Sequence, residues 1–544
     1  MIRLRGLSLI LAILLGIHVF ALASIPVNAS EALSKPITIR TIYVDNQNVF
    51  NPEIEKESGF AYRLTNALHI RTRERVVKEY LLFKTGDTLS VQLIEESERI
   101  LRAKRNLQDA EITYQVDGLN ADIYVKTLDT WSLKPKVSYK HKGNVSKTEF
   151  GIQEDNLLGL GIRASLSYRN DGERESKVLK LRDDNVFGNW HTAAITYIDS
   201  TDGNKQYAGF FKPFYALNVK RSYGIEYGHT DKETTLYEQG DELYRYRSNS
   251  QFSNLFWGYS SGLKNNNVLR HTFGLFSETK DYEAISAYIN LEYNVLQHQF
   301  LPNNYQSTYP YYAIDYLQNS YRKTINFERI GRTEDIYMGF KAGFKIGYGD
   351  ERWGNDESRW YTHAYAQKTY ALGENQLLFL SANMDGRLSD KGSQNLLATA
   401  GFKYYHAQTN YFKGYLDMYS HTAINTDEND TLYLDADSGL RGYPLHYISG
   451  QHLQKITLEQ RYYSDSYLWR IFHVGATAFF DAGRITGASD PTQDGIYKDF
   501  GLGLRLSNNR SSKGDVIHID LAYPMDAQEA DKGWTLSIES KATF

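Results

Sequence analysis

The sequence predicts a mainly β protein: a membrane-spanning antiparallel barrel preceded by a small α/β domain. Three observations support this prediction: an apolar export segment at the N-terminus, segments that alternate apolar and polar residues from about residue 131, and an unusual composition. With 43 tyrosines, 41 glycines and a mean hydropathy of −0.51, the 544-residue chain is too polar for a bundle of membrane helices and too aromatic to be disordered. A barrel with a wet interior and aromatic girdles has this composition.

Charge and cysteine content exclude several classes of protein. The 61 basic and 65 acidic residues leave a formal charge of −4, which disfavours a generally basic nucleic-acid-binding protein. The absence of cysteine excludes structural disulfides, thiol nucleophiles and cysteine-bound zinc. Export without cysteines is compatible with a bacterial periplasm or outer membrane.

The first residues form an export segment. Two arginines precede an apolar stretch, and small-residue cleavage sites end at Ala23 and at Ala29. We favour cleavage after Ala29, because Pro26 breaks the apolar helix just upstream. A retained membrane anchor is the alternative, since residues 6–25 are uncharged and long enough to span a bilayer. We therefore expect a signal peptide over residues 1–29.

Residues 30–130 are predicted to form one small α/β domain with the element order β-α-α-β-β. Alternation marks the strands, and apolar residues at helical spacing mark the helices. The predicted elements are a strand at 37–43, a helix after Thr72, a helix capped by Ser90, and strands at 111–116 and 121–127. We interpret residues 46–70 as an insertion or loop.

From about residue 131 the chain reads as barrel strands. The last segment, 534–544, places apolar residues on one face and polar residues on the other, and segments 474–483, 498–507 and 515–523 do the same. A strand between lipid and water has this alternation. A soluble β-sandwich alternates as well. The export segment, the tyrosine excess and the end of the chain on the apolar face at Phe544 favour the barrel.

A polar stretch over about 422–450 separates two predicted strands and contains an arginine within Gly-Leu-Arg-Gly-Tyr. Parity places Asp481 on the polar face of its strand, and we expect Glu459 there too. Because an arginine fork binds carboxylates bidentately, Arg441 and these two residues suggest a loop folded into the barrel lumen. The alternative is a solvated arginine and two unrelated wall carboxylates, and spacing alone leaves both open.

Four motifs in order resemble the family that includes BamA, TamA and the transporters of two-partner secretion. They are an early-barrel turn at 153–161, an Arg-Gly-Tyr loop tip at 440–443, an FxDxG strand at 479–483 and a GxGxR strand at 501–505. The β-α-α-β-β unit resembles the periplasmic POTRA domain of that family. The resemblance implies a contact between the loop tip and wall carboxylates, made by Arg441, Gly442, Tyr443, Asp481 and Glu459. It also implies a barrel motif made by Phe479, Gly483, Gly501, Gly503 and Arg505.

Two features depart from the family pattern. The family barrel has sixteen strands, whereas about twenty alternating segments can be counted from 131 to 544. We attribute the excess, in 240–420, to long extracellular hairpins, with a larger barrel as the alternative. The chain also has one POTRA-like unit where family members carry two or more, which leaves the client and accessory partners open.

By this resemblance, we expect an outer-membrane protein that inserts or translocates β-rich polypeptides without ATP or a cofactor. Its expected partners are outer-membrane lipids and lipopolysaccharide, unfolded client polypeptides and periplasmic accessory proteins, with no nucleic acid. A passive porin or surface protein on the same scaffold is one alternative. A secretion pore for a single partner is another.

Enzyme and metal motifs are weak. Residues 258–262 match GxSxG, but no helix pattern follows, so we expect small residues of a barrel strand rather than a nucleophile elbow. We therefore expect no catalytic residues. Five acidic residues, Asp427, Glu428, Asp430, Asp435 and Asp437, could attract calcium. We interpret them as a solvated loop and expect no metal site.

The last predictions concern the first and last predicted strands of the barrel. The first strand, about 131–141, must pair with the last, about 534–544, to close a barrel. Pro135 has no N–H to donate, so we predict a joint with fewer hydrogen bonds, where a client strand could enter. The alternative is that Pro135 merely starts a regular strand. Phe544 resembles the terminal aromatic signal that barrel-assembly machinery reads.

Overall fold

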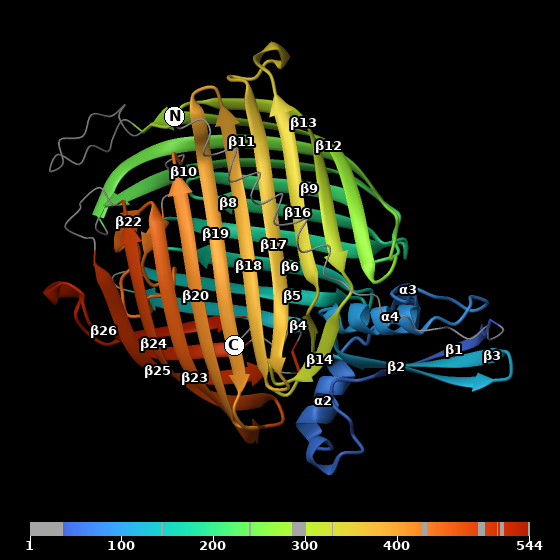
Figure 1. Ribbon diagram of the computed structural model, residues 1–544. Helices are drawn as coiled ribbons and strands as arrows, with labels where there is room; N and C mark the ends of the chain where they lie inside the picture. Colours follow the sequence, from blue (N-terminus) through green and yellow to red (C-terminus); the bar gives the residue numbers. More distant parts are fainter. Residues whose placement is uncertain are drawn as a thin grey trace.

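The computed structural model describes residues 36–142, 145–238, 241–285, 301–328, 330–426, 432–487, 495–508, 510–511 and 516–541. These residues form a small N-terminal domain and one large curved sheet, with the domain at one end of the sheet (Figure 1). The expected signal peptide, 1–29, and Phe544 lie outside the described residues. None of the helices in the described part of the chain is long and apolar enough to cross a membrane.

The N-terminal domain packs helices on a three-stranded sheet. Its elements are β1 (Thr38–Gln47), η1 (Glu55–Glu57), α2 (Phe60–Leu68), α3 (Glu74–Glu79), α4 (Val91–Ala103), β2 (Leu107–Asp117) and β3 (Asn120–Asp129). The sheet order is β1-β3-β2, with β1 parallel and β2 antiparallel to β3. Val77, Leu101 and Ile123 are among the buried core residues. The hydroxyl of Ser90 accepts from the Leu93 N–H, as its predicted capping role requires.

Helix α2 corrects one prediction. It lies within residues 46–70, which the sequence had suggested were an insertion or loop. The helix spans nine residues, has apolar residues four apart at Phe60, Leu64 and Leu68, and buries none of its residues. The rest of the domain follows the predicted β-α-α-β-β order.

The large sheet contains twenty antiparallel strands, in an order that places β27 next to β4. The sheet curls round into a barrel shape (Figure 1). The strands are β4 (Leu133–Lys142), β5 (Val145–Leu157), β6 (Ile162–Asn170), β7 (Glu175–Val186), β8 (His191–Ser200), β9 (Gly203–Lys212), β10 (Arg221–Glu238), β11 (Asp241–Ser260), β12 (Asn267–Ala284), β13 (Tyr305–Gln318), β16 (Phe340–Gly349), β17 (Arg359–Gly373), β18 (Gln376–Ser389), β19 (Gly392–Ala407), β20 (Phe412–Ile424), β23 (His452–Leu468), β24 (Phe472–Thr486), β25 (Ile496–Asn508), β26 (Val516–Pro524) and β27 (Thr535–Lys541).

Short elements occupy the connections between these strands. They are two hairpins, β14 (Tyr321–Ile325) with β15 (Thr333–Tyr337) and β21 (Leu432–Leu434) with β22 (Ile448–Gly450), and the single turns η2 (Glu351–Trp353) and η6 (Glu529–Asp531). Each hairpin belongs to a long connection, so β13 pairs with β16 and β20 pairs with β23 in the wall.

The expectation of sixteen strands is wrong, because the sheet has twenty. Apart from β14 and β15, the described strands within 240–420 are wall strands rather than extracellular hairpins. Strand β11, for example, pairs along its length with β10 on one side and β12 on the other. A segment with ladder partners on both sides belongs to the wall, however polar and tyrosine-rich it is. The larger-barrel alternative agrees with the structure.

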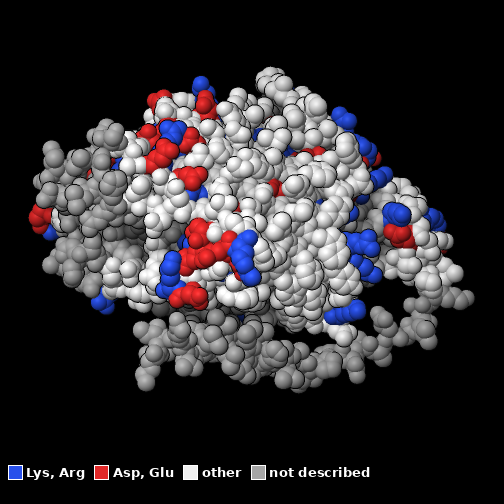
Figure 2. Space-filling view, turned by 90° about the horizontal axis from the view of Figure 1, so that it is seen from above, with Lys and Arg blue, Asp and Glu red and all other residues white. Residues whose placement is uncertain are grey.

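Side-chain parity in the strands is as predicted. In β25, Phe500, Leu502 and Leu504 are exposed on the outside, whereas Asp499 and Arg505 are buried. Leu502 is 66% exposed, and similar outward apolar residues recur on most strands. Seen from above, charged side chains gather in a few groups separated by broad stretches that carry none (Figure 2). The mainly β fold with an apolar outer surface is therefore confirmed.

The barrel has a near end, which faces the N-terminal domain, and a far end. Three contacts around the near rim hold the domain against it: Asn156 to the Thr72 hydroxyl (3.0 Å), the Leu217 N–H to Glu96 (2.7 Å), and Arg510 to Glu57 (2.5 Å). These contacts come from the end of β5 and from the β9–β10 and β25–β26 turns. The domain is thus fixed to the barrel at points spread around its near end.

Candidate functional site: a far-end loop and a near-end hairpin inside the barrel

The connection between β20 and β23, residues 425–451, is called the far-end loop. Its described part packs a small apolar core against the inner wall, in which Leu434, Leu440 and Ile448 meet Leu453 and Ile485. Asp435 organises the turn that follows β21, because its side chain accepts from the backbone N–H groups of residues 437, 438 and 446. The loop therefore folds inward as a structured unit that positions its Arg-Gly-Tyr tip.

Arg441 at this tip lies among carboxylates of the inner wall. Its guanidinium hydrogen-bonds Glu459 on β23, lies 3.2 Å from Asp481 on β24 and lies 3.8 Å from Asp520 on β26. It also sits 3.9 Å from the centre of the Phe479 ring. We call Arg441, Glu459, Asp481 and Asp520 the arginine–carboxylate cluster. The structure brings together the arginine and both carboxylates named from the sequence, and a solvated loop arginine does not fit this arrangement.

The two residues after Arg441 bind the neighbouring strands. The Gly442 N–H donates to Asp499 at 3.0 Å, and the Tyr443 hydroxyl donates to the Lys498 carbonyl at 3.0 Å. A Cβ on residue 442 would lie 2.9 Å from the Pro524 nitrogen, closer than side chains approach backbone. Glycine at this position therefore allows the tip to lie directly on β25 and β26.

Sequence reasoning missed three charged residues of this region. Asp499 and Asp520 have the same inward parity as Asp481, and that parity could have identified them. Arg461 donates to Glu459 at 2.8 Å, and Arg505 donates to Asp520 at 2.5 Å. Arginines and carboxylates therefore pair across the inner face of β23 to β26, except that Asp499 lies opposite Asp481 in the ladder and accepts from the Gly442 N–H instead of from an arginine.

The glycines of the barrel motif make room for this packing. A Cβ on Gly501 would overlap the Phe479 ring, and one on Gly503 would overlap the Asp520 carboxylate. A Cβ on Gly483 would lie 2.7 Å from Leu434 of the far-end loop. The motif Phe479, Gly483, Gly501, Gly503 and Arg505 is thus a wall surface shaped to accept the loop and its arginine.

A second connection folds over the interior at the near end. Residues 319–339, between β13 and β16, are called the near-end hairpin and contain β14 and β15. Asp335 of this hairpin accepts from Arg102 of α4 at 2.7 Å and 2.8 Å. On the opposite side, the hydroxyls of Tyr405 on β19 and Tyr463 on β23 donate to hairpin carbonyls at 3.2 Å and 3.1 Å. The hairpin therefore crosses the near end of the barrel, from the N-terminal domain on one side to strands β19 and β23 on the other.

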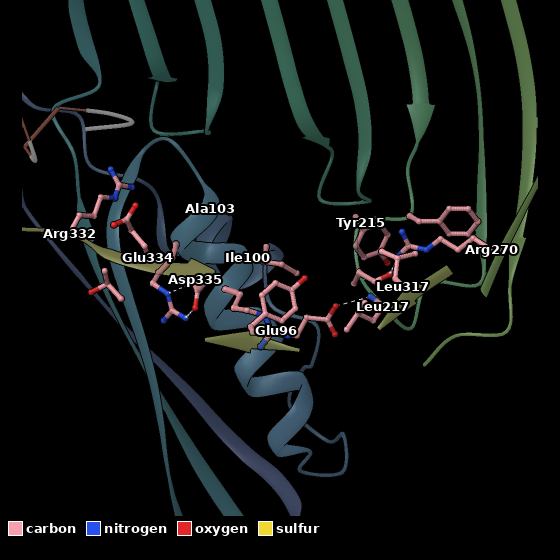
Figure 3. Close-up of a pocket in the computed structure, with 16 residues that line it drawn as sticks. Glu96, Ile100, Ala103, Tyr215, Leu217, Arg270, Leu317, Arg332, Glu334 and Asp335 are labelled. Carbon is pink, nitrogen blue, oxygen red and sulfur yellow. Dashed lines mark hydrogen bonds and ion pairs between the residues drawn. The ribbon is translucent and has the colours of Figure 1, made fainter. Parts of the chain in front are cut away.

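Further contacts attach the hairpin to the N-terminal domain. Arg332 donates to the Leu107 carbonyl at 3.2 Å, Thr333 donates to Asp109 at 3.1 Å, and Lys323 pairs with Glu98 at 3.2 Å. Beside them a cavity of about 500 Å³ lies between α4, the hairpin and the β9–β10 connection (Figure 3). Burial here raises the pKa of Glu96, whose carboxylate accepts from the Leu217 N–H.

Pro135 was predicted to weaken the joint between the first and last strands, and its pairing with the neighbouring strand β5 is regular. Pro135 pairs with Ile152 of β5 without a register shift. On the other side β4 neighbours β27, which has seven residues. The Trp131 N–H donates to the Arg510 carbonyl at 2.6 Å, so the base of β4 is also tied to the β25–β26 turn. The prediction of few hydrogen bonds between β4 and β27 stays a prediction.

The enzyme and metal motifs lie in structural positions. Gly258 and Ser260 end strand β11, and the Gly262 N–H donates to the Ser260 hydroxyl in the turn that follows. Residues 427–431 lie outside the described residues, and Asp435 serves the turn of the far-end loop. Within the described ranges, no group of histidine and acidic residues has the arrangement of a metal site.

Comparisons with known proteins gave the following results. No family model matches the chain, and no curated protein matches it. Solved structures do match. CdiB from Escherichia coli is 13% identical with a TM-score of 0.46, over 95% of this chain and 92% of that one. BamA from Haemophilus ducreyi lacking POTRA domains 1–3 is 12% identical with a TM-score of 0.40, over 96% and 89%.

The FrpB iron transporter from Neisseria meningitidis also matches, at 8% identity and a TM-score of 0.40, over 77% of this chain and 83% of that one. BamA is also one of the proteins named in the family that the sequence motifs resemble.

Proposed function

We propose that this protein spans the bacterial outer membrane and inserts β-rich polypeptides into it, or translocates them across it, without ATP. The observation that carries the proposal is the far-end loop, whose Arg441 is docked on β23, β24 and β26. In the strand order β26 is followed by β27 and then by β4, so these strands lie beside the joint between β27 and β4. A buried contact of this kind can hold the wall beside the joint in one arrangement and release it in another.

The outer surface of the sheet supports the membrane placement. Leucine, isoleucine and aromatic side chains face outward along successive strands, among them Leu166, Ile225, Leu255, Phe273 and Leu502. In water an apolar surface of this extent would drive aggregation, whereas in lipid it needs no further cover. On this placement the near end, with the N-terminal domain, faces the periplasm.

The joint between β27 and β4 is the proposed entry point for a client. At this joint Pro135 of β4 has no N–H to donate to a ladder, whereas β10 and β11 pair over eighteen positions elsewhere in the wall. Strand backbone left unpaired in lipid costs several kcal/mol per group, so an incoming strand would be held there by hydrogen bonds. In the N-terminal domain β1 and β2 are edge strands and offer a second place for strand addition.

The contents of the barrel favour this role over a passive porin. The far-end loop occupies the inner face of β23 to β26, and the near-end hairpin crosses the other mouth. Together these two elements obstruct the lumen at both ends, whereas a passive porin keeps a continuous water-filled channel. A secretion pore for one partner remains the second candidate, because displacing both elements would open the lumen.

Cross-linking of the joint tests the proposal. The chain has no cysteine, so engineered pairs that join residues 136–140 to 538–541 can be oxidised without background. In liposomes that hold the purified protein, we expect oxidation to abolish the accelerated insertion of an unfolded barrel client. A pair at Ala382 and Ala400, which face each other across β18 and β19, is the matched control and should leave activity intact.

Two outcomes would redirect the proposal. Full client insertion by a completely cross-linked joint would rule out entry between β27 and β4. Steady ion conductance by the protein, with no effect on client insertion, would favour a passive porin. Proteomics of outer membranes from a deletion strain would then identify the affected clients, or the single exported partner of a secretion pore.

A further inference from the structure

Helix α2 turns its apolar face outward, whereas an ordinary surface helix turns that face toward the core. Its apolar residues Phe60, Leu64 and Leu68, spaced four apart on one face, are 74%, 46% and 66% exposed. Ala61 and Ala67 flank them and are exposed too. A soluble amphipathic helix turns such a face toward the core, so this face needs another cover.

The opposite, more polar face of α2 holds the helix on the protein. Asn66 exchanges two hydrogen bonds with the Phe50 backbone, at 2.7 Å and 3.1 Å, and the Tyr62 ring packs on the Phe50 ring at 4.8 Å. The orientation is therefore fixed by specific contacts, and the outward apolar face is a built feature of the fold.

Contacts with the near rim place this helix beside the barrel wall. The Tyr62 hydroxyl donates to the Trp469 carbonyl at 3.0 Å in the β23–β24 turn. Just before the helix, Glu57 pairs with Arg470 at 3.1 Å and with Arg510 at 2.5 Å. In Figure 1 the helix lies below the barrel, away from the β2–β3 hairpin.

The outer surface of β23 continues toward the same place. Leu458, Tyr462 and Leu468 face outward along this strand, and Trp469 at its end is 72% exposed. Tryptophan at the end of an apolar column is typical of a membrane–water interface. Arg63, exposed beside the apolar face of α2, has the length to keep its charge in water or on a lipid phosphate while its stem lies on apolar surface.

We propose that α2 lies in the periplasmic surface of the outer membrane and buries Phe60, Leu64 and Leu68 among phospholipid acyl chains. The inference rests on the proposed membrane placement of the barrel and adds a lipid contact for the N-terminal domain. An interfacial helix of this kind has an apolar face, a polar face and flanking basic residues. Continuity with the lipid-facing column of β23 is what favours lipid over another protein.

The experiment uses the full chain in liposomes and single cysteines that carry an environment-sensitive fluorophore. Position 64 reports on α2. Position 502, on the outer wall, is the lipid control, and position 119, in the exposed turn between β2 and β3, is the water control. We expect brominated phospholipids to quench the labels at 64 and 502 at least twofold and to leave the label at 119 unchanged.

Any other quenching result contradicts either the lipid contact of α2 or the membrane placement of the barrel. Quenching at 502 with none at 64 would overturn the lipid contact of α2 and leave the barrel placement intact. No quenching at 502 would overturn the placement and this inference with it. A label at 64 that is shielded from water yet not quenched would show a protein cover, such as a second copy or the residues before 36.

A double variant tests the helix face itself. With the label at position 61, Leu64→Glu with Leu68→Glu should reduce quenching at least twofold, because carboxylates do not enter acyl chains. Leu119→Glu is the matched control and should not change it. Both variants alter exposed side chains, and heat-modifiable mobility on gels will verify that the barrels fold.

Discussion

The far-end loop and the near-end hairpin are both connections that fold over the barrel interior, but they are attached in opposite ways. In the far-end loop the arginine lies on the loop, and its carboxylates, Glu459 and Asp481, lie on the wall. In the near-end hairpin the carboxylate, Asp335, lies on the connection, and Arg102 belongs to the N-terminal domain. The loop thus closes a contact within the barrel, whereas the hairpin couples two domains.

Burial separates the two regions further. The side chain of Arg441 is 17% exposed and that of Asp481 is fully buried. At the near end the Arg102 side chain is 6% exposed and that of Asp335 is 16% exposed, but the Lys323 side chain in the same set of contacts is 54% exposed. Ion pairs weaken as they become hydrated. We therefore expect the far-end loop to control the stability of the barrel and the near-end hairpin to control access and domain coupling.

The largest effect is expected from Arg441→Ala. Removing this side chain leaves Glu459 and Asp481 buried without their shared partner, which costs about 3–5 kcal/mol. Denaturant unfolding in detergent micelles measures the loss. Arg484→Ala, at an exposed arginine of β24, is the control and should change stability by less than about 0.5 kcal/mol. A loss below about 1 kcal/mol for Arg441→Ala would mean that the cluster is hydrated and that the contrast in burial has no energetic meaning.

The second effect is a pH dependence of the near end. Burial between the domain and the barrel lowers the pKa of Lys104, at the end of α4, to about 8 from 10.5. Below pH 8 the lysine is charged in both states, and the folded state bears the cost of burying that charge. Between pH 8 and 10.5 the unfolded chain binds the extra proton, so stability rises with pH, by up to about 3 kcal/mol.

The measurement compares unfolding free energies of the native protein and Lys104→Met from pH 7 to pH 11. The difference between the two curves isolates this lysine from other titrating groups. A difference that stays constant across this range would show that Lys104 is hydrated and that the near end has no such response.

The third effect concerns the hairpin. Arg102→Ala removes two hydrogen bonds of 2.7 Å and 2.8 Å to Asp335, and hydrogen bonds to charged groups contribute about 1.5–3 kcal/mol. We expect chymotrypsin to cleave the near-end hairpin at least tenfold faster, because cleavage follows the population of the opened form. Lys126→Ala, at an exposed residue of β3, is the control. Cleavage that accelerates equally in the far-end loop would indicate global destabilisation instead.

The same two regions show what the sequence could predict. Parity identified the inward face of β24 and β25, and the Arg-Gly-Tyr motif pointed to the loop tip, because both signals are local. Asp520 was missed as a partner of Arg441, although its parity was visible, because which strands face each other across the loop depends on distant pairing.

The near-end hairpin has no distinctive local signal in the sequence, whereas α2 has one that was overlooked. Residues 319–339 lie within 240–420, where alternation also occurs in true wall strands, so nothing local separates β14 and β15 from their neighbours. The count of about twenty alternating segments was correct, and the expectation of sixteen strands came from the family resemblance alone. Helix α2 does carry a local signal, because Phe60, Leu64 and Leu68 recur at helical spacing, and the interpretation of 46–70 as a loop overlooked it.

The smallest effect is expected from Lys323→Ala, which sharpens the comparison within the hairpin itself. Lys323 pairs with Glu98 at 3.2 Å, on the same helix as Arg102, so the two variants cut neighbouring attachments between the same elements. Because the lysine is more than half exposed, the pair should contribute less than about 1 kcal/mol, and less still in high salt. Chymotrypsin cleavage of the hairpin should therefore accelerate less than about fivefold, and 0.5 M salt should remove the difference from the native protein. An acceleration as large as that of Arg102→Ala would show that the hairpin is held by the summed charge of α4 rather than by the buried pair between Arg102 and Asp335.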